Sequence, residues 1–272
     1  MEKSKNGKGN KSFIVIIVLL VIALIGLIVY ICYDKGLILK NNRNIKVTDV
    51  KNENTTKEQN IDINNAIVQE LYNIFKLSTD SDSCYMSVDS LNNSNLVKLR
   101  IAYNNISDSL YNNVNCGELE LYEGGICGSM EHNSEMLKAY GNNDMVKFRE
   151  LEKQNYTDSI SAEVMERKLK LLFGSDFSVK HESFGYGHLV EPSCYVMKYD
   201  ENKKLYARFM CEGGGTCGGV SQELLSATKK DNKLYINTKV TEYDNQEYDV
   251  KYTFKKDTIN ENYVFEKVEK LQ

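Results

Sequence analysis

Of the residue types in this chain, cysteine could take part in the widest range of chemistry. Seven occur; one lies in the apolar segment near the start, and the other six are Cys84, Cys116, Cys127, Cys194, Cys211 and Cys217. An even number of cysteines in an oxidising compartment predicts a disulfide framework, although sequence alone leaves the pairing open. Short segments that contain glycine favour Cys211 with Cys217 and Cys116 with Cys127. Cys84 and Cys194 are then left to form the third bond.

The same cysteines do not have the spacing of a zinc site. Structural zinc sites usually take cysteine ligands in pairs separated by about two to four residues. Here 10 residues separate Cys116 from Cys127, 5 separate Cys211 from Cys217, and no histidine follows at the usual distance. The sequence therefore predicts no metal site. A redox role for Cys211 and Cys217, with a labile bond between them, is a further alternative.

A glycine pattern at Gly213, Gly215 and Gly218 matches the G-x-G-x-x-G sequence of dinucleotide-binding loops. It follows an expected strand and precedes residues 221–228, for which a short helix is one interpretation. A dinucleotide site also needs a crossover to a parallel strand, whereas the strands that follow here have an antiparallel pattern. We therefore interpret the glycines as a loop held by cysteines and predict no cofactor.

Three histidines leave little material for a catalytic site. His181 or His188 could serve as the base for an unpaired cysteine, because thiolate attack needs a neighbouring base and an orienting group. Both also fit exposed loops, which is the interpretation we favour. Paired carboxylates of the kind found in muramidases are a further possibility, because acidic residues are plentiful. A cell-envelope hydrolase or a thiol-based enzyme is therefore the alternative function.

The chain has one clear membrane signal. Residues 13–32 form a run of 20 residues without a charge, and a helix of that length spans the roughly 30 Å hydrocarbon core of a bilayer. The run is longer than the apolar region of a cleaved signal peptide, and no small-residue cleavage site follows it. We expect an uncleaved signal-anchor, that is, a single transmembrane helix in contact with the lipid bilayer.

Orientation is predicted from the flanks of this segment. Four basic side chains lie on each side, so the comparison of positive charge decides nothing by itself. Long domains are translocated largely regardless of charge, whereas the tail 1–12 is short and densely basic. We expect the tail in the cytoplasm and the C-terminal domain outside it. Of the 34 basic and 38 acidic residues, the tail holds four lysines and Glu2, so 30 basic and 37 acidic residues remain outside. This acidic balance argues against nucleic acid as a partner.

The exterior part divides by composition. Residues 33–60 are too polar to bury a core and predict a flexible stalk, and residues 61–272 predict the folded domain. Helical periodicity predicts helices at 62–77 with Asp62 as the N-cap and at 162–173 between Ser161 and Gly174. Residues 95–106 fit both the alternation of a strand and the period of a helix, and the cap chemistry at Ser94 and Asn95 favours the helix. A faint repeat of helix, cysteines and paired glycines leaves two subdomains, with a boundary near 157–161, as an alternative, but we favour a coincidence of glycine and cysteine in loops.

After residue 176 the apolar period changes to two. Strands are expected at 177–184, 194–199, 205–211, 234–240, 248–254 and 263–268, with turns at 200–204, 244–246 and 260–262. Short connections between alternating strands predict an antiparallel meander. The expected fold is therefore α+β, with helices packed on one curled antiparallel sheet after the transmembrane helix. A cystatin-like or NTF2-like arrangement fits this order, but a fold carries no function.

These features predict a single-pass cell-membrane protein whose disulfide-stabilised exterior domain binds a partner without catalysis. The partner would be a protein or a cell-wall polymer. Separately, the Asn- and Lys-rich, Pro-poor and Trp-free composition suggests an AT-rich bacterial genome. Tyrosine rings on the strands are the candidate contacts, unless they cover the core of the sheet itself. They are Tyr195, Tyr199, Tyr206, Tyr235, Tyr243, Tyr248 and Tyr252.

Overall fold

The computed structural model describes residues 58–77, 86–122, 124–129, 133–185, 195–210, 220–242 and 244–271. Ser107–Leu110 belongs to a different compact unit from the rest of the described chain. It holds the 3₁₀ turn η1 (Asp108–Leu110), in which the Leu110 N–H donates to the Ser107 carbonyl at 2.9 Å. All further elements belong to the other unit.

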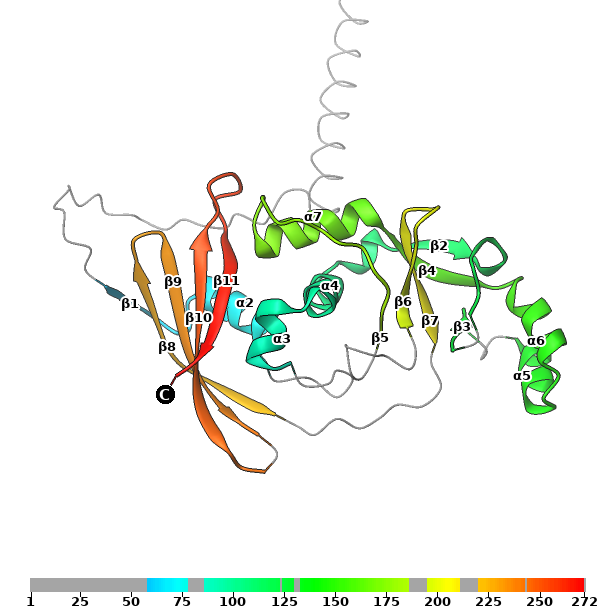
Figure 1. Ribbon diagram of the computed structural model, residues 1–272, viewed down its shortest axis with the longest axis horizontal. Helices are drawn as coiled ribbons and strands as arrows, with labels where there is room; N and C mark the ends of the chain where they lie inside the picture. The colour runs from blue at the N-terminus through cyan, green and yellow to red at the C-terminus, as the bar shows by residue number, and fades with distance from the viewer. Residues whose placement is uncertain are drawn as a thin grey trace, which may run out of the picture. The chain divides into compact units, whose positions relative to one another are not determined.

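Two antiparallel sheets form the framework of the described chain, and helices accompany them (Figure 1). Sheet A has the strand order β1-β8-β9-β10-β11, and its last four strands are consecutive in sequence. Strand β1 pairs with one end of β8, from Gln59 opposite Lys229 to Ile61 opposite Ala227. The bounds are β1 (Gln59–Ile61), β8 (Ser221–Lys230), β9 (Lys233–Thr241), β10 (Glu247–Lys256) and β11 (Tyr263–Lys270).

Sheet B is assembled from segments that lie farther apart in the sequence. Its strand order is β2-β4-β7-β6-β5, and β3 also pairs with β7. Every described pairing in it is antiparallel. The bounds are β2 (Asn112–Asn115), β3 (Ile126–Cys127), β4 (Tyr156–Ser161), β5 (Phe184–Gly185), β6 (Tyr195–Asp200) and β7 (Leu205–Met210).

The helices begin at side chains that cap the free N–H groups of the first turn. Asn65, Ser87, Ser94, Asn133, Asp144 and Ser161 each accept a hydrogen bond from the backbone of the helix that follows. The helices are α2 (Ala66–Phe75), α3 (Val88–Asn93), α4 (Asn95–Asn104), α5 (Ser134–Gly141), α6 (Met145–Glu152) and α7 (Ala162–Phe173). A further 3₁₀ turn, η2 (Cys116–Glu118), follows β2.

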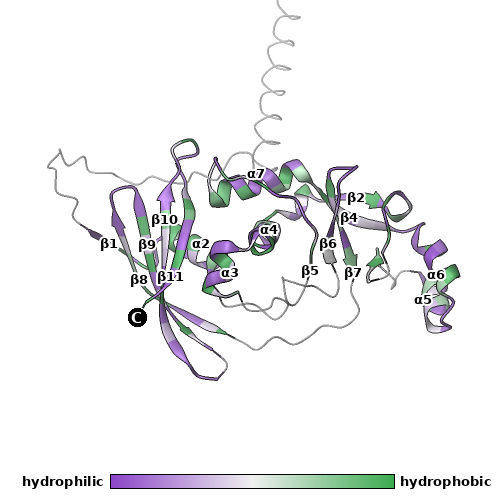
Figure 2. Ribbon diagram, in the orientation of Figure 1, coloured by the Kyte–Doolittle hydropathy of each residue, from purple (hydrophilic) through white to green (hydrophobic). Residues whose placement is uncertain are grey.

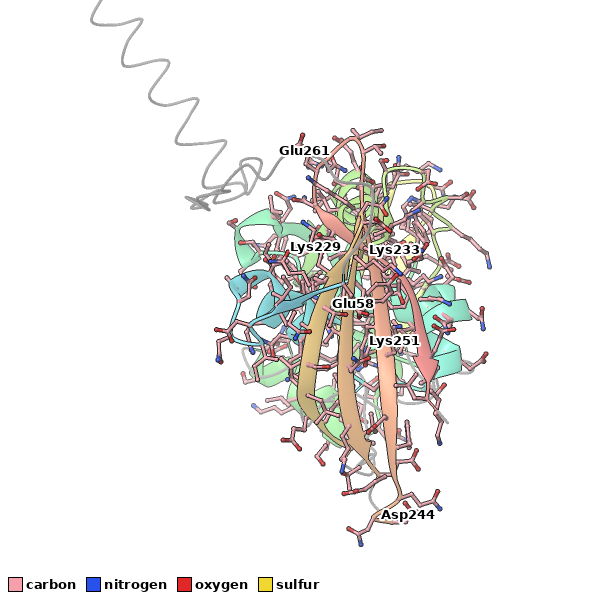
Figure 3. All side chains as sticks on the ribbon, turned by 90° about the vertical axis from the view of Figure 1, so that its left-hand side faces the viewer. Glu58, Lys229, Lys233, Asp244, Lys251 and Glu261 are labelled. Atoms are coloured by element: carbon pink, nitrogen blue, oxygen red, sulfur yellow. A yellow bond between two sulfur atoms is a disulfide. The ribbon has the colours of Figure 1, made fainter. Side chains whose placement is uncertain are left out.

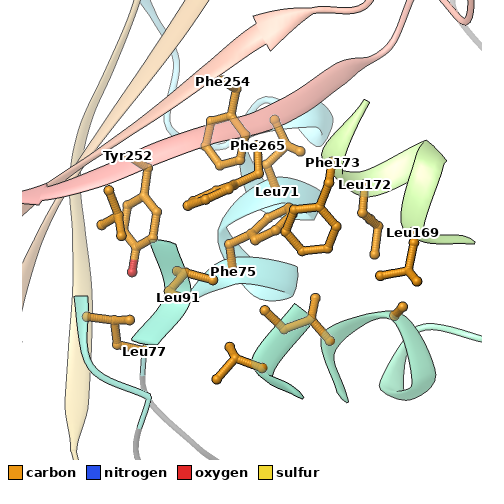
Figure 4. Close-up of a cluster of buried hydrophobic side chains, with 14 of the residues drawn as sticks. Leu71, Phe75, Leu77, Leu91, Leu169, Leu172, Phe173, Tyr252, Phe254 and Phe265 are labelled. Carbon is orange, nitrogen blue, oxygen red and sulfur yellow. The ribbon is translucent and has the colours of Figure 1, made fainter. Parts of the chain in front are cut away.

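The main core is continuous from the inner face of sheet A, through α2, α4 and α7, to one face of sheet B. Aromatic rings dominate the part beside sheet A (Figure 4). The Phe75 ring of α2 stacks on Phe265 at 5.0 Å and meets the Phe173 ring edge-on at 5.7 Å. Hydropathy alternates along the strands of sheet A, so the face opposite the core is polar (Figure 2).

Several helix predictions are confirmed. Helix α7 has the predicted bounds, with Ser161 as its N-cap and Gly174 at its C-terminal end. Helix α4 begins after Ser94, and its residues are helical despite the alternative strand pattern. The N-cap predicted at Asp62 is wrong: Asp62 accepts from Asn64 N–H in a turn, and Asn65 caps α2. The chain turns at Asp62, whose carbonyl accepts the Asn65 N–H at 2.9 Å, so the first helical residue is Ala66 and Asn65 takes the cap position.

The strand predictions hold mainly for the end of the chain. Strands β6, β7, β9, β10 and β11 and the three predicted turns between them occur where expected. The predicted strand at 177–184 is wrong, because only Phe184 of that segment pairs, with Met197. The short helix considered for 221–228 is also wrong, since these residues form β8 and pair with β9. The strands divide between two sheets instead of one curled sheet.

The predicted boundaries also need correction. Strand β1 includes Gln59 and Asn60, which the sequence assigned to the stalk. The predicted sub-boundary at 157–161 falls inside β4, a strand that pairs with both β2 and β7. No helix within the described ranges is long and apolar enough to cross a membrane. The predicted anchor 13–32 and tail 1–12 lie outside those ranges, as does the stalk up to residue 57.

Candidate functional site

The structure joins one of the three predicted cysteine pairs. Cys116 and Cys127 form a disulfide with a Cα–Cα distance of 5.8 Å. Cys116 begins η2 and Cys127 ends β3, and both side chains are fully buried. The other four predicted cysteines, and also His188, lie outside the described residues, so their pairings stay predictions.

The disulfide holds the described residues of the segment 116–127 against the outer face of sheet B. Buried side chains from this segment and from β7 form a small second core around Leu119, Cys116, Ala207 and Phe209. The Tyr122 ring packs on Phe209 at 5.1 Å. The disulfide thus keeps this segment packed on the apolar outer face of sheet B, which would otherwise be exposed to solvent. We name residues 116–127 the clamp segment.

A buried carboxylate fixes the end of the clamp segment. Glu152, at the end of α6, is fully buried and accepts the Cys127 N–H at 2.6 Å. Its other oxygen lies 2.6 Å from the Arg149 guanidinium, which also donates to the Gly125 carbonyl at 3.2 Å. Burial of a charge is tolerated when it is paired and hydrogen-bonded in this way. The geometry therefore attaches the α5–α6 hairpin to the clamp segment.

A hollow of about 310 Å³ lies between the clamp segment and the β6–β7 hairpin. Its apolar lining comes from Leu119, Ala207 and Phe209. Its polar lining is Glu120, Lys198, Tyr199, Asp200, Glu201 and Asn202. The Lys198 amine already donates to the Glu120 carbonyl at 2.7 Å. The three carboxylates outnumber the one amine, so the rim of the hollow is acidic.

His181 is the one sequence-selected histidine that the structure describes. Its Nε2 lies 3.1 Å from Glu166 Oε1 of α7, and its Nδ1 lies 2.8 Å from the Tyr206 hydroxyl. A carboxylate only accepts, so Nε2 carries the proton in neutral His181, and Nδ1 accepts from Tyr206. The ring also stacks on Tyr199 at 4.9 Å.

A histidine that is hydrogen-bonded to a carboxylate resembles a general base held in position. Here, however, the contacts of His181 connect neighbouring elements of the fold. Tyr206 is fully buried, and this burial, with a smaller contribution from Tyr199, raises the pKa of its hydroxyl. Both ring nitrogens of His181 are engaged, and the two described cysteines are bonded to each other. His181 therefore joins α7 to sheet B, and the described chain places no thiol beside it.

The predicted tyrosine contacts are mostly core residues. Tyr206 and Tyr252 are buried, and Tyr199 packs between His181 and Tyr206. Tyr235 lies on the outer face of sheet A, where the Lys251 amine sits 4.4 Å from its ring centre. Tyr243 and the side chain of Tyr195 are not among the described parts. The tyrosines thus do not form one common surface.

Glu152, which holds the clamp segment, and Glu166, which contacts His181, were not singled out from the sequence. Glu152 and Glu166 look like ordinary charged positions of amphipathic helices. The i, i+3 spacing of Arg149 and Glu152 is a visible signal for an ion pair, but it does not reveal burial. In the described chain, no group of three or more metal-ligating side chains comes together. No family model, curated protein or solved structure matches the chain.

Proposed function

We propose that this chain is a single-pass cell-membrane protein whose exterior α+β domain binds a protein or cell-wall partner. Residues 13–32 would anchor it in the bilayer, with residues 1–12 in the cytoplasm and a stalk before the domain. The observation that carries the proposal is the Cys116–Cys127 disulfide, because such bonds persist mainly in oxidising, extracytoplasmic compartments. The uncharged run 13–32 supports it independently.

The hollow beside the clamp segment is the proposed binding site of the domain. It lies next to the disulfide, combines an apolar floor with a polar rim, and is lined by exposed Glu120 and Glu201. The cystatin-like or NTF2-like arrangement stays a prediction, as does the enzyme alternative. The thiol-based form of that alternative depends on His188 and on cysteines outside the described ranges, and the hydrolase form needs two facing carboxylates.

The membrane topology of the full chain is tested on spheroplasts with an intact cell membrane. Proteinase K added outside spheroplasts should remove a C-terminal tag from the full chain, and a tag at the N-terminus should survive until the membrane is lysed. Protection of the C-terminal tag would contradict the outward orientation. Mass spectrometry of non-reduced peptides from the same material should recover the Cys116–Cys127 link.

Binding is tested with the rim of the hollow. The full chain and the double variant Glu120→Lys with Glu201→Lys are compared for retention of envelope material. Both side chains are exposed, so the variant should fold normally, and reversal of two charges should reduce retention about tenfold or more. The double variant Glu150→Lys with Glu261→Lys changes the net charge equally on other exposed surfaces. Equal retention by all three proteins would exclude the hollow.

A further inference from the structure

The outer face of sheet A carries many charged side chains along its strands (Figure 3). Cross-strand register divides this face into successive rows of residues, which we number from the β9–β10 turn. Row 1 holds Ser221, Thr241 and Glu247, and row 2 holds Glu223, Lys239 and Asp249. Row 3 holds Ser226, Asn237, Lys251 and Glu269, and row 4 holds Thr228, Tyr235, Thr253 and Lys267. Row 5 holds Lys230, Lys233 and Lys255, with Glu266 paired to Lys233 at 2.6 Å.

The net charge of these rows changes in one direction. Counted by side-chain type on β8 to β11, rows 1 and 2 are each negative by one charge, row 3 is neutral, row 4 is positive by one and row 5 is positive by two. Ion pairs within one copy already join neighbouring rows, since Lys239 lies 3.2 Å from Glu247 and Lys267 lies 2.8 Å from Glu269. Glu58, directly before β1, adds one negative charge at the β8 edge of the row 5 end. A face that only contacts water gains from opposite charges on neighbouring strands. Row 2 has that arrangement, since Lys239 lies between Glu223 and Asp249.

Row 5 has the opposite arrangement. Lys233 lies directly between Lys230 and Lys255, and like charges in such cross-strand positions are destabilising. Glu266 neutralises one of the three amines. A departure from the local rule at one end of an otherwise balanced face points to a charge supplied from outside the molecule.

We propose that this face is the interface between two copies of the chain. A two-fold axis that lies in the interface and crosses the strands sets row 5 of one copy opposite row 1 of the second copy. Row 4 then faces row 2, and neutral row 3 lies on the axis. Each positive row therefore meets a negative one, as an isologous interface requires of a self-complementary surface. Lys255 of one copy comes opposite Glu247 of the second copy on the same strand.

The available area is adequate for a dimer of moderate stability. Strands β8 and β10 have ten residues each, β9 has nine and β11 has eight. At roughly 3.3 Å per residue and 4.8 Å between strands, the face offers about 600 Å² on each copy, or about 1,200 Å² in total. Charge on the interface should make the dimer sensitive to salt.

A long anionic polymer is the main competing occupant of row 5. Such a polymer would also meet rows 1 and 2 of the same face, where negative charge repels it. A second copy makes use of both ends of the gradient. The two occupants differ in their prediction for the acidic end, because only a dimer needs the negative rows.

The test uses the full chain purified in detergent, with two different affinity tags. Variant one carries Lys230→Glu and Lys255→Glu, and variant two carries Glu247→Lys and Asp249→Lys. Each variant alone should self-associate about tenfold or more weakly than the wild type in sedimentation equilibrium. An equimolar mixture should restore association, because one face is then negative at both ends and the other positive. Lys138→Glu with Lys153→Glu, both exposed outside this face, is the matched control.

Zero-length carbodiimide cross-linking of isotopically mixed wild-type protein gives a second measurement that needs no substitution. It should yield a Lys255–Glu247 link between light and heavy copies. The proposal is overturned if the wild type is monomeric, if the variants associate as the wild type does, or if mixing does not restore association. Loss of polyphosphate binding in variant one, with an unchanged oligomeric state, would instead assign row 5 to an anionic polymer.

Discussion

The two sheets of this protein are built in different ways. Sheet A places four consecutive strands of eight to ten residues side by side, so most of its pairing comes from hairpins. Sheet B gathers strands of two to six residues from positions between 112 and 210, and helices interrupt their order. Short strands that are distant in sequence gain less from local pairing. Sheet B accordingly has a disulfide and a buried ion pair at its outer face.

The two sheets should therefore be stabilised by different interactions. In sheet A, the strands and the aromatic core beneath them should suffice. In sheet B, the clamp segment should supply order that the short strands do not provide. Substitutions in the two regions should therefore differ both in size and in how far their effects spread.

The largest effect is expected from Phe75→Ala. The Phe75 ring is buried between Phe173, Phe254 and Phe265, so its removal leaves a cavity beneath sheet A (Figure 4). The free energy of unfolding should fall by about 3–5 kcal/mol in urea denaturation. Phe75→Leu retains much of the volume and should cost less. Equal stability of the alanine variant and the wild type would show that this cluster does not hold the core together.

The second prediction concerns the clamp segment. Replacing both Cys116 and Cys127 by serine removes a bond that closes a short loop, which should cost about 3 kcal/mol through the entropy of the unfolded chain. Hydrogen exchange should accelerate in residues 116–127 and in β7, while the strands of sheet A keep their protection. Equal loss of protection in β9 and β10 would show that the two sheets unfold as one unit.

The same contrast explains what the sequence could predict. Strands β9, β10 and β11 follow one another through short turns, so alternation and turn residues were enough to locate them. Positive backbone φ angles at Asn245 and Glu261 lie within two of the predicted turns. Segment 177–183, which precedes β5 of sheet B, has an alternating pattern but forms no strand. No local signal in the sequence reveals that it lacks a partner strand. The bounds of α7 were predictable because its N-cap, its apolar stripe and the glycine at its C-terminal end all indicate the same helix.

The candidate site was less predictable for a physical reason. The hollow depends on the approach of Glu120 to Lys198, two residues that are distant in sequence. His181 was selected as a possible base, but its partners Glu166 and Tyr206 come from different elements. A single sequence records which residue types are present and leaves their distances undetermined. The Cys116–Cys127 pair was accessible because a short loop limits where its ends can lie.

The third prediction tests the connection between sheet A and α7. Asp257 in the β10–β11 turn accepts the N–H groups of Asn260 and Ile259, and also that of Ser175 beyond α7. These bonds, first those from Asn260 and Ser175, lower the pKa of Asp257 to about 2. Because the native pKa lies below that of the unfolded chain, the stabilisation is present above pH of about 4 and is lost as pH falls toward 2.

Asp257→Asn removes the charge and keeps the shape. The asparagine side chain keeps an acceptor oxygen for the turn N–H groups but loses the charge, so we expect a loss of about 1 kcal/mol at neutral pH. The difference from the wild type should shrink as the pH is lowered through this window, as measured by urea denaturation at several pH values. A constant difference at every pH would mean that the bonds do not depend on the carboxylate.

The smallest effect is expected at the outer edge of sheet A. There the Asn92 amide of α3 donates to the Val268 carbonyl at 2.8 Å, and the Val268 N–H donates to Asn92 Oδ1 at 2.9 Å. One side chain thus forms both bonds that a neighbouring strand residue would form, and it covers the edge of β11. Asn92→Asp keeps the acceptor and loses the donor, which should cost about 0.5 kcal/mol of unfolding free energy.

Asn92→Ala removes both bonds and also opens the edge to other strands. It should therefore aggregate faster than Asn92→Asp, whose negative charge would repel an incoming edge, even if the two variants are similarly stable. Light scattering during mild heating, compared with urea denaturation of the same proteins, separates these two effects. If both variants aggregate like the wild type, the covered edge does not protect sheet A, and its regular hairpins alone keep it monomeric at that edge.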